Sequence, residues 1–236
     1  MKALGERIVF EDNHVLVVNK LCSELVQGDK TGDICLLDSL KAFIKERDGK
    51  PGNVFLGLVH RLDRPSSGLV VYAKTSKALS RLTSSFRERN ATKEYLVITE
   101  KQRAGSVGLD PAGRLTDFLL KNGKTNTSRV VQGPPGKEAV LDYQLVEELQ
   151  TFLVWKVHLQ TGRHHQIRVQ FAARGYPVRG DLKYGARRSI PGGGIGLHAW
   201  KLCLPHPTQD TQLILEANPR ESQQDDLWSK ISLFEH

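Results

Sequence analysis

Apolar residues recur along this chain with two different periods, and the strand-like period is the more frequent. Arg7–Phe10 and Val15–Asn19 are short β-type runs separated by polar residues, which predicts an antiparallel hairpin. Leu69–Ala73 is apolar at every position. Because a strand with one solvated face alternates apolar and polar residues, this continuous run predicts a strand covered on both faces.

Three other segments repeat apolar residues at intervals of three or four positions, which predicts helices with one face against a core. In the third of them, Ile167 and Phe171 lie one turn apart and are expected to face the core. The expected helices are one capped by Asp33 and ended by residues 50–52, one capped by Thr75 or Ser76, and one over Arg163–Arg174 that Gly175 closes.

The remaining strand-like runs are spread over the rest of the chain. They are Val54–Arg64, Glu94–Thr99, Thr116–Lys121, Thr127–Val131, Glu138–Val146, Phe152–Leu159, Leu197–Leu204 and Leu213–Ala217. The turn-rich segment Gly105–Gly136 is expected to hold only short β runs and to be flexible or a mobile edge. Because strands outnumber helices and rarely alternate with them, the predicted fold class is α+β, with a mixed, mainly antiparallel central sheet flanked by helices and loops.

The composition narrows the class of protein. A chain of 236 residues with 39% hydrophobic content can fill a real core. No apolar run approaches the length of a membrane span, and the N-terminal residues lack the order of a secretory signal. We therefore expect a cytosolic protein with no membrane partner. Cys22, Cys35 and Cys203 are widely spaced and odd in number, so neither a disulfide framework nor a cysteine zinc site is predicted.

The charge adds a candidate partner. The formal net charge is +8 and the isoelectric point is near 9.4. Between Lys156 and Arg188 the only acid is Asp181, which favours a phosphate-binding surface over a merely solvated basic face. On the third expected helix, polar side chains follow spacings of three and four residues, and we expect this stripe to face a nucleic-acid backbone. The stripe consists of Arg163, Gln166, Gln170 and Arg174.

Polar groups are concentrated between two apolar runs at Val59–Leu69. In an extended chain, Arg61 and Asp63 lie on one face. A carboxylate kept ionised by a cation in a desolvated pocket acts as a nucleophile or a base. These residues alone fit a structural ion pair equally well.

A longer resemblance starts at His60. The segment HRLDRPSSGLVVYAKT resembles the catalytic motif of the RluA family of RNA pseudouridine synthases, with Ser66 in place of the usual threonine. Four other blocks resemble the family in the expected order, and the opening residues Glu11–Lys20 are also similar. Those blocks are Lys93–Tyr95, Leu159–Val169, Gly180–Gly185 and Leu197–Trp200. At Leu21–Glu24 the chain departs from the Pro- and Gly-containing turn of its relatives.

The resemblance implies an enzyme that isomerises uridine in RNA. Asp63 matches the catalytic carboxylate, which either attacks the nucleotide or removes a sugar proton to give a glycal. Arg168 matches the basic residue that pairs with this acid and keeps it ionised. Tyr95 matches the aromatic residue that stacks on the uracil and assists the final proton removal from C5. Arg61 matches the residue that fills the gap left by the flipped nucleotide.

The same resemblance sets the expected partners. Residues 1–236 are expected to form a single catalytic domain without an N-terminal accessory RNA-binding domain, and to act as a monomer on ribosomal or transfer RNA. The other residues expected to bind RNA are Arg163, Gln166, Arg174, Arg187 and Arg188. Isomerisation needs no redox step, so no cofactor and no metal are expected. His164 and His165, expected on a helix with rings about 100° apart, should be RNA-facing or structural.

Two other function classes compete with this interpretation. The first is a non-catalytic RNA-binding or RNA-chaperone protein on the same scaffold. It would be favoured if the acid, the tyrosine or the arginine were missing, but Asp63, Tyr95 and Arg168 are all present. The second is a metal-dependent nuclease, which needs clustered carboxylates. The matched blocks supply only two aspartates for such a cluster, Asp63 and Asp181, so the nuclease ranks last.

Overall fold

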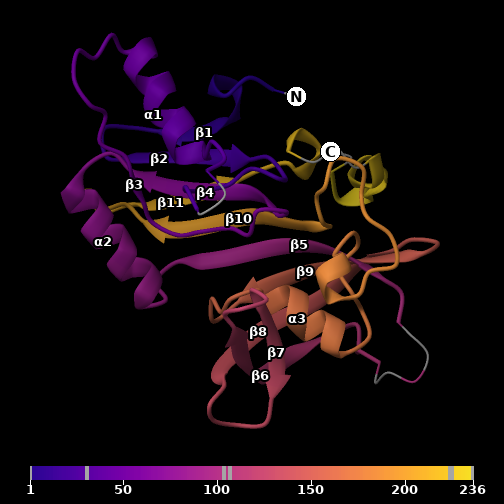
Figure 1. Ribbon diagram of the computed structural model, residues 1–236. Coiled ribbons are helices and arrows are strands. Elements are labelled where there is room, and N and C mark those ends of the chain that lie inside the picture. Colours follow the sequence, from indigo (N-terminus) through magenta and orange to yellow (C-terminus); the bar gives the residue numbers. More distant parts are fainter. Residues whose placement is uncertain (1, 30–31, 103–104, 106–107, 223–225, 235–236) are drawn as a thin grey trace. The chain divides into compact units, whose positions relative to one another are not determined.

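The computed structural model describes residues 2–29, 32–102, 105, 108–222 and 226–234. The chain divides into two compact units, Met1–Thr92 with Ala199–Gln224 and Lys93–His198 with Asp225–His236. Each unit combines antiparallel strands with helices (Figure 1). This architecture confirms the predicted α+β class. Within the described ranges, no helix is both long and apolar enough to cross a bilayer.

In the first unit, strands run in the order β1, β2, β4 and β10, with β3 paired to β4 and β11 paired to β10. The β1–β2 pair is the predicted hairpin. The elements are β1 (Ile8–Glu11), β2 (Val15–Lys20), α1 (Leu36–Arg47), β3 (Gly57–Leu58), β4 (Ser67–Ala73), α2 (Ser76–Arg87), β10 (Leu197–Pro205) and β11 (Gln212–Glu216).

Strands β2 and β4 are buried on both faces, as the continuous apolar run predicted. Alternate residues of a strand point to opposite faces. Val17 and Val71 therefore pack with Leu82 of α2, whereas Val18 and Val70 pack with α1. The helices cover the two faces and exclude water from both.

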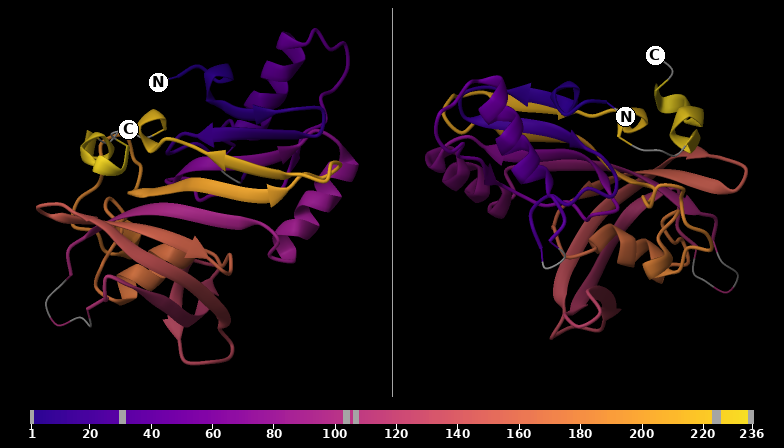
Figure 2. Two further views of the ribbon diagram at one scale, coloured as in Figure 1. Left: turned by 180° about the vertical axis from the view of Figure 1, so that it is seen from behind. Right: turned by 45° about the horizontal axis from the view of Figure 1, so that its top comes forward.

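The second unit has strands in the order β5, β9, β8, β6 and β7, all antiparallel to their neighbours (Figure 2). Trp155, Tyr143, Phe171 and Tyr176 meet edge to face around its core, with ring centroids 5.7 to 6.1 Å apart. The elements are β5 (Thr92–Glu100), β6 (Ala112–Asn122), β7 (Thr127–Val131), β8 (Lys137–Glu148), β9 (Phe152–Leu159) and α3 (Gln166–Ala173). Ile167 and Phe171 are buried as predicted.

Three local expectations were wrong. Helix α1 begins at Leu36, because the carbonyl of Leu25 accepts the Leu36 N–H at 2.7 Å and no side-chain cap is made. The carboxylate of Asp33 instead pairs with Arg64 at 2.8 Å. Of the expected strand Val54–Arg64 only Gly57–Leu58 pairs with β4.

The third correction concerns Gly105–Gly136, which was expected to hold only short β runs. Eleven of its residues form β6, because β8 on one side and β7 on the other supply backbone partners. Residues 106 and 107 of this segment lie outside the described residues.

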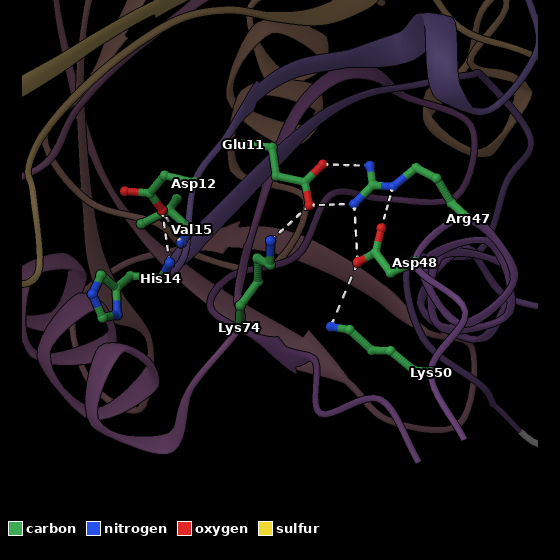
Figure 3. A network of polar contacts seen from close by, with 8 residues as sticks. All are labelled: Glu11, Asp12, His14, Val15, Arg47, Asp48, Lys50 and Lys74. Atoms are coloured by element: carbon green, nitrogen blue, oxygen red, sulfur yellow. Dashed lines mark hydrogen bonds and ion pairs between the residues drawn. The ribbon is translucent and has the colours of Figure 1, made fainter. Parts of the chain in front are cut away.

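A network of ion pairs fastens β1 to the end of α1 and to the residue after β4 (Figure 3). The Glu11 carboxylate accepts from both terminal nitrogens of Arg47, at 2.7 and 2.8 Å, and from Lys74 Nζ at 2.7 Å. Arg47 also pairs with Asp48 at 2.7 Å. The hydrogen bonds from Arg47 and then Lys74 outweigh partial burial and lower the pKa of Glu11 to about 2.

This lowered pKa predicts a pH-dependent contribution to stability. The contribution is complete above the ordinary pKa of 4.5 and is lost as the pH falls towards 2. Glu11→Gln should therefore lower the free energy of unfolding by about 1 to 3 kcal/mol at pH 7. Chemical unfolding of both proteins at several pH values checks this. A variant that is equally destabilised at pH 7 and pH 3 would contradict the assignment.

Candidate active site

The loop between β3 and β4 holds the predicted catalytic acid. Its backbone follows β4 as far as Val59, whose N–H donates to the Val71 carbonyl at 3.2 Å. At the next position, His60 Nε2 accepts the Val71 N–H at 3.2 Å, and the imidazole stacks on Phe86 at 4.7 Å. A side chain thus replaces the backbone as the partner of β4, which is why the strand ends here.

Beyond His60 the loop presents its polar residues. Arg61 is exposed, Leu62 packs against the α1 core and Asp63 is half-buried. The Ser66 N–H donates to the Asp63 carbonyl at 3.0 Å, which closes a turn through Pro65. The acid is therefore held at the start of a tight turn.

Lys20 lies beneath this turn and is completely buried. Its ammonium donates to three backbone carbonyls, those of Leu21, Glu24 and Arg64, at 2.8, 2.9 and 3.1 Å. Burial lowers its pKa to about 7, while the charges of Glu24 and Asp63 act in the opposite direction. The lysine fixes the residue next to Asp63 and places a positive charge under the loop.

The turn at residues 21–24, where the chain departs from its relatives, is closed by Glu24. Its carboxylate accepts the Leu21 N–H at 2.9 Å and a hydrogen bond from the buried Arg7 at 2.8 Å. Arg64 donates from Nε to the Ser23 carbonyl at 3.1 Å. The Glu24 carboxylate thus supports this turn, and Arg64 ties the turn to the loop of Asp63.

Gly68 allows β4 to start directly behind the loop. Its φ of 111° lies in the region that favours glycine, and a Cβ at this position would overlap the backbone of Ala199. The close approach of the two strands at this point requires glycine.

In the second unit, Arg168 is held by a buried carboxylate. Its Nε and Nη2 donate to Asp181 at 2.6 and 2.9 Å, and both side chains are at most 4% exposed. The guanidinium carbon lies 5.0 Å from the ring centre of Tyr184. Tyr95 is 8% exposed and lies on β5 opposite Val157 of β9. The pair with Asp181 holds two nitrogens of Arg168 in a fixed orientation.

The prediction that the polar stripe faces RNA is wrong for its two central residues, Gln166 and Gln170. Gln166 is buried, and its amide bonds to Thr161 Oγ1 at 2.8 Å and to the Val140 carbonyl at 3.1 Å. Gln170 is also buried and donates to Asp117 at 2.7 Å. These side chains satisfy polar groups of β6 and β8, so the stripe faces the sheet. Gln166 is therefore a structural residue.

The other predicted RNA-binding residues differ in their surroundings. Arg174 makes two hydrogen bonds to Asp117, at 2.7 and 3.0 Å. Arg163 is half-buried and donates from Nε to the Glu138 carbonyl at 2.7 Å. Arg187 and Arg188 are exposed in the loop after Tyr184. Both side chains are accessible to solvent, and Arg187 also lies 3.8 Å from the Glu100 carboxylate.

The two histidines do not lie along a helix as expected. His165 precedes α3 with a left-handed φ of 54°, and its ring stacks on His164 at 3.7 Å. Among the described residues, no group of three or more His, Cys, Asp or Glu side chains could hold a metal ion.

Known proteins resemble this chain over most of its length. The sequence profile of RNA pseudouridylate synthases matches residues 14–173, which contain Asp63, Tyr95 and Arg168. The chain belongs to the RNA pseudouridylate synthase family. It is 33% identical over 213 residues to the uncharacterized RNA pseudouridine synthase YlyB of Bacillus subtilis, covering 89% of this chain and 68% of that protein.

Two other proteins that resemble this chain carry the large ribosomal subunit in their names. Identity is 33% to ribosomal large subunit pseudouridine synthase D of Vibrio vulnificus, over 89% of this chain and 66% of that protein. It is 32% to ribosomal large subunit pseudouridine synthase C of Vibrio parahaemolyticus, over 93% of this chain and 67% of that protein. The chain thus spans about two thirds of the length of these relatives.

Solved structures agree on the pseudouridine synthase fold. Human RNA pseudouridylate synthase domain containing 4 superposes with a TM-score of 0.72 at 24% identity, over 91% of this chain and 88% of that one. Human RNA pseudouridylate synthase domain containing 1 gives a TM-score of 0.68 at 26% identity, over 88% and 81%. The fold and family predicted from the sequence are confirmed.

Sequence reasoning assigned no role to Lys20 or Tyr184 and did not pair Asp181 with Arg168. Asp181 and Tyr184 lie in the Gly180–Gly185 block, so the block itself was the available signal. Lys20 ends the similar opening segment. Nothing in the sequence indicates that its ammonium binds the Arg64 carbonyl, because that contact joins residues 44 positions apart.

The buried pair predicts an unequal response to two similar substitutions. Asp181→Asn leaves the Arg168 charge buried without compensation, which costs roughly 3 to 5 kcal/mol. Asp142→Asn removes a carboxylate that pairs with Arg114 on the surface, and should change the melting temperature far less. Thermal unfolding of both variants tests this. Equal melting temperatures would show that the Arg168–Asp181 pair is not desolvated.

Proposed function

We propose that this chain isomerises uridine to pseudouridine in structured RNA, with Asp63 as the catalytic carboxylate. The observation that carries the proposal is the support of Asp63 within its own unit, in a chain of this family. Its loop is anchored by His60 on one side and by Lys20 on the other. A carboxylate must be held in a fixed geometry to act on one sugar carbon.

The chemistry needs few groups. The C1′–N1 bond breaks, the detached uracil turns, and C5 bonds to C1′ and then loses its proton. Asp63 either attacks the nucleotide or removes a sugar proton to give a glycal. Arg168 is proposed to act as the basic partner of Asp63 in the reaction. Tyr95 stacks on the uracil and assists the last proton removal, and Arg61 fills the gap in the RNA.

Ribosomal RNA is the first substrate class to test, because two relatives are named for the large ribosomal subunit. Transfer RNA is the second. Target choice between them depends on the fold of the RNA around the uridine.

Asp63→Asn should abolish isomerisation and leave the fold and most RNA affinity intact, because the amide cannot serve as nucleophile or base. The measurement is tritium released from 5-tritiated uridine in ribosomal and transfer RNA transcripts. Asp142→Asn is the matched control, since it removes a surface carboxylate by the same change. Measurable release by Asp63→Asn would refute the assigned carboxylate.

Tritium release should also continue in EDTA with the transcript uncut, because each step is assigned to a side chain of this protein. Cleavage that magnesium restores would instead favour a nuclease. Tight binding of RNA without tritium release from any cellular RNA would favour a non-catalytic RNA-binding protein.

The exposed pair Arg187 and Arg188 is proposed to bind RNA phosphates. The double substitution to Gln should reduce the slope of log K against log[salt] by about 0.7 to 0.9 for each lost contact. Binding titrations at several salt concentrations measure this slope. An unchanged slope would place the RNA elsewhere. Arg174 is left unchanged in the variant, because its charge already pairs with Asp117.

A further inference from the structure

The β6–β7 hairpin carries exposed cations without an acid among them. Lys121, Lys124 and Arg129 are all exposed. In the sequence, no aspartate or glutamate occurs from Phe118 to Lys137. Within its own residues the hairpin therefore carries positive charge that no acid offsets, in a part of the chain to which the proposed function assigns no role.

The charges surround the end of the hairpin. Lys121 lies opposite Ser128, and Leu120 lies opposite Arg129, so Lys121 and Arg129 point to opposite faces of the ribbon. Lys124 belongs to the turn between the strands. A two-stranded ribbon charged on both faces and at its tip fits a partner that presents phosphates on both sides, as a groove or folded loop of RNA does.

The protection of a sheet edge explains these charges only in part. Cations on an edge strand block pairing with another chain. This accounts for Arg129, because β7 stands at the end of the strand order and is therefore an edge strand. It does not account for Lys124 in the turn, nor for Lys121 on β6, which is paired with β7 at that residue.

The turn is fastened to the segment that leads into α3. His164 bonds through Nδ1 to Ser128 Oγ at 2.9 Å and through Nε2 to Asn126 Oδ1 at 3.1 Å. The Ser128 N–H donates to the Tyr184 hydroxyl at 2.8 Å, and Lys183 Nζ donates to the Asn126 carbonyl at 3.3 Å. Helix α3 itself lies against β6 and β7 (Figure 1).

These contacts hold the hairpin relative to Arg168 in the same unit, because Tyr184 bonds His165 at 2.7 Å and lies over the Arg168 guanidinium. Fixing a loop before binding removes the entropy cost of ordering it on the partner.

We propose that the tip of the β6–β7 hairpin, with Lys121, Lys124 and Arg129, is an RNA-backbone contact that grips phosphates outside the target nucleotide. The proposal rests on the proposed function in that the partner is the RNA substrate. It adds a surface that includes none of the residues assigned above to catalysis or RNA binding.

The test is RNA binding by a variant with Lys121, Lys124 and Arg129 all changed to Gln. The probe is a ribosomal RNA transcript. Each lost phosphate contact should reduce the magnitude of the slope of log K against log[salt] by about 0.7 to 0.9, so the loss of all three should reduce it by about 2 to 3. Affinity at low salt should fall at least tenfold. If the triple variant does not fold, Lys124→Gln alone should lower the slope by about 0.7 to 0.9.

The matched control removes three exposed lysines of the first unit, Lys45, Lys50 and Lys77, by the same change to Gln. It loses the same net charge and should keep nearly the wild-type affinity and tritium release. An equal loss of affinity in the control, or a wild-type slope in the hairpin variant, overturns the proposal.

Binding and chemistry are read separately. If wild-type protein binds the transcript but releases no tritium, the proposed function fails, while the slopes still decide the hairpin contact. If Asp63→Asn is inactive and the hairpin variant binds like wild type, only the hairpin proposal fails. His164→Ala, which keeps every cation, should weaken binding severalfold without changing the slope.

Discussion

The ammonium group of Lys20 lies inside the first unit, where water cannot solvate it. A buried charge is tolerated only when fixed polar groups surround it. The groups that do so are the carbonyls of Leu21, Glu24 and Arg64, so one buried lysine holds two loops together. One of these loops carries Asp63. The position of the proposed catalytic acid thus depends on the lysine beneath it.

The second unit follows the same constraint with a different cation. Arg168 is buried on α3, and Asp181 supplies the compensating charge from a loop 13 residues further along. Because Asp181 lies in the Gly180–Gly185 segment, Tyr184 is brought over the guanidinium. Tyr184 and His164 then bind the β6–β7 turn. A chain of polar contacts therefore runs from one buried ion pair to the basic β6–β7 hairpin.

The local patterns were most informative where burial is uniform. The apolar run at Leu69–Ala73 identified a strand covered on both faces, and Thr75 caps α2 as expected, accepting the Ala78 N–H at 3.1 Å. The patterns failed where the partner of a polar group is distant in sequence. Gln166 and Gln170 have the spacing of a solvated stripe, yet they bond to β6 and β8. Periodicity alone does not distinguish a stripe that meets water from one that meets backbone.

The sequence by itself determined the α+β class, most of the elements, the family and the candidate residues Asp63, Tyr95 and Arg168. Each of these follows from short-range spacing or from motifs that are contiguous in the chain. Only the tertiary structure decided that Asp181 compensates Arg168, that Lys20 supports the loop of Asp63, and that His164 ties down a basic hairpin. Those choices depend on which distant polar groups share a water-free space, and a linear pattern carries no such distances.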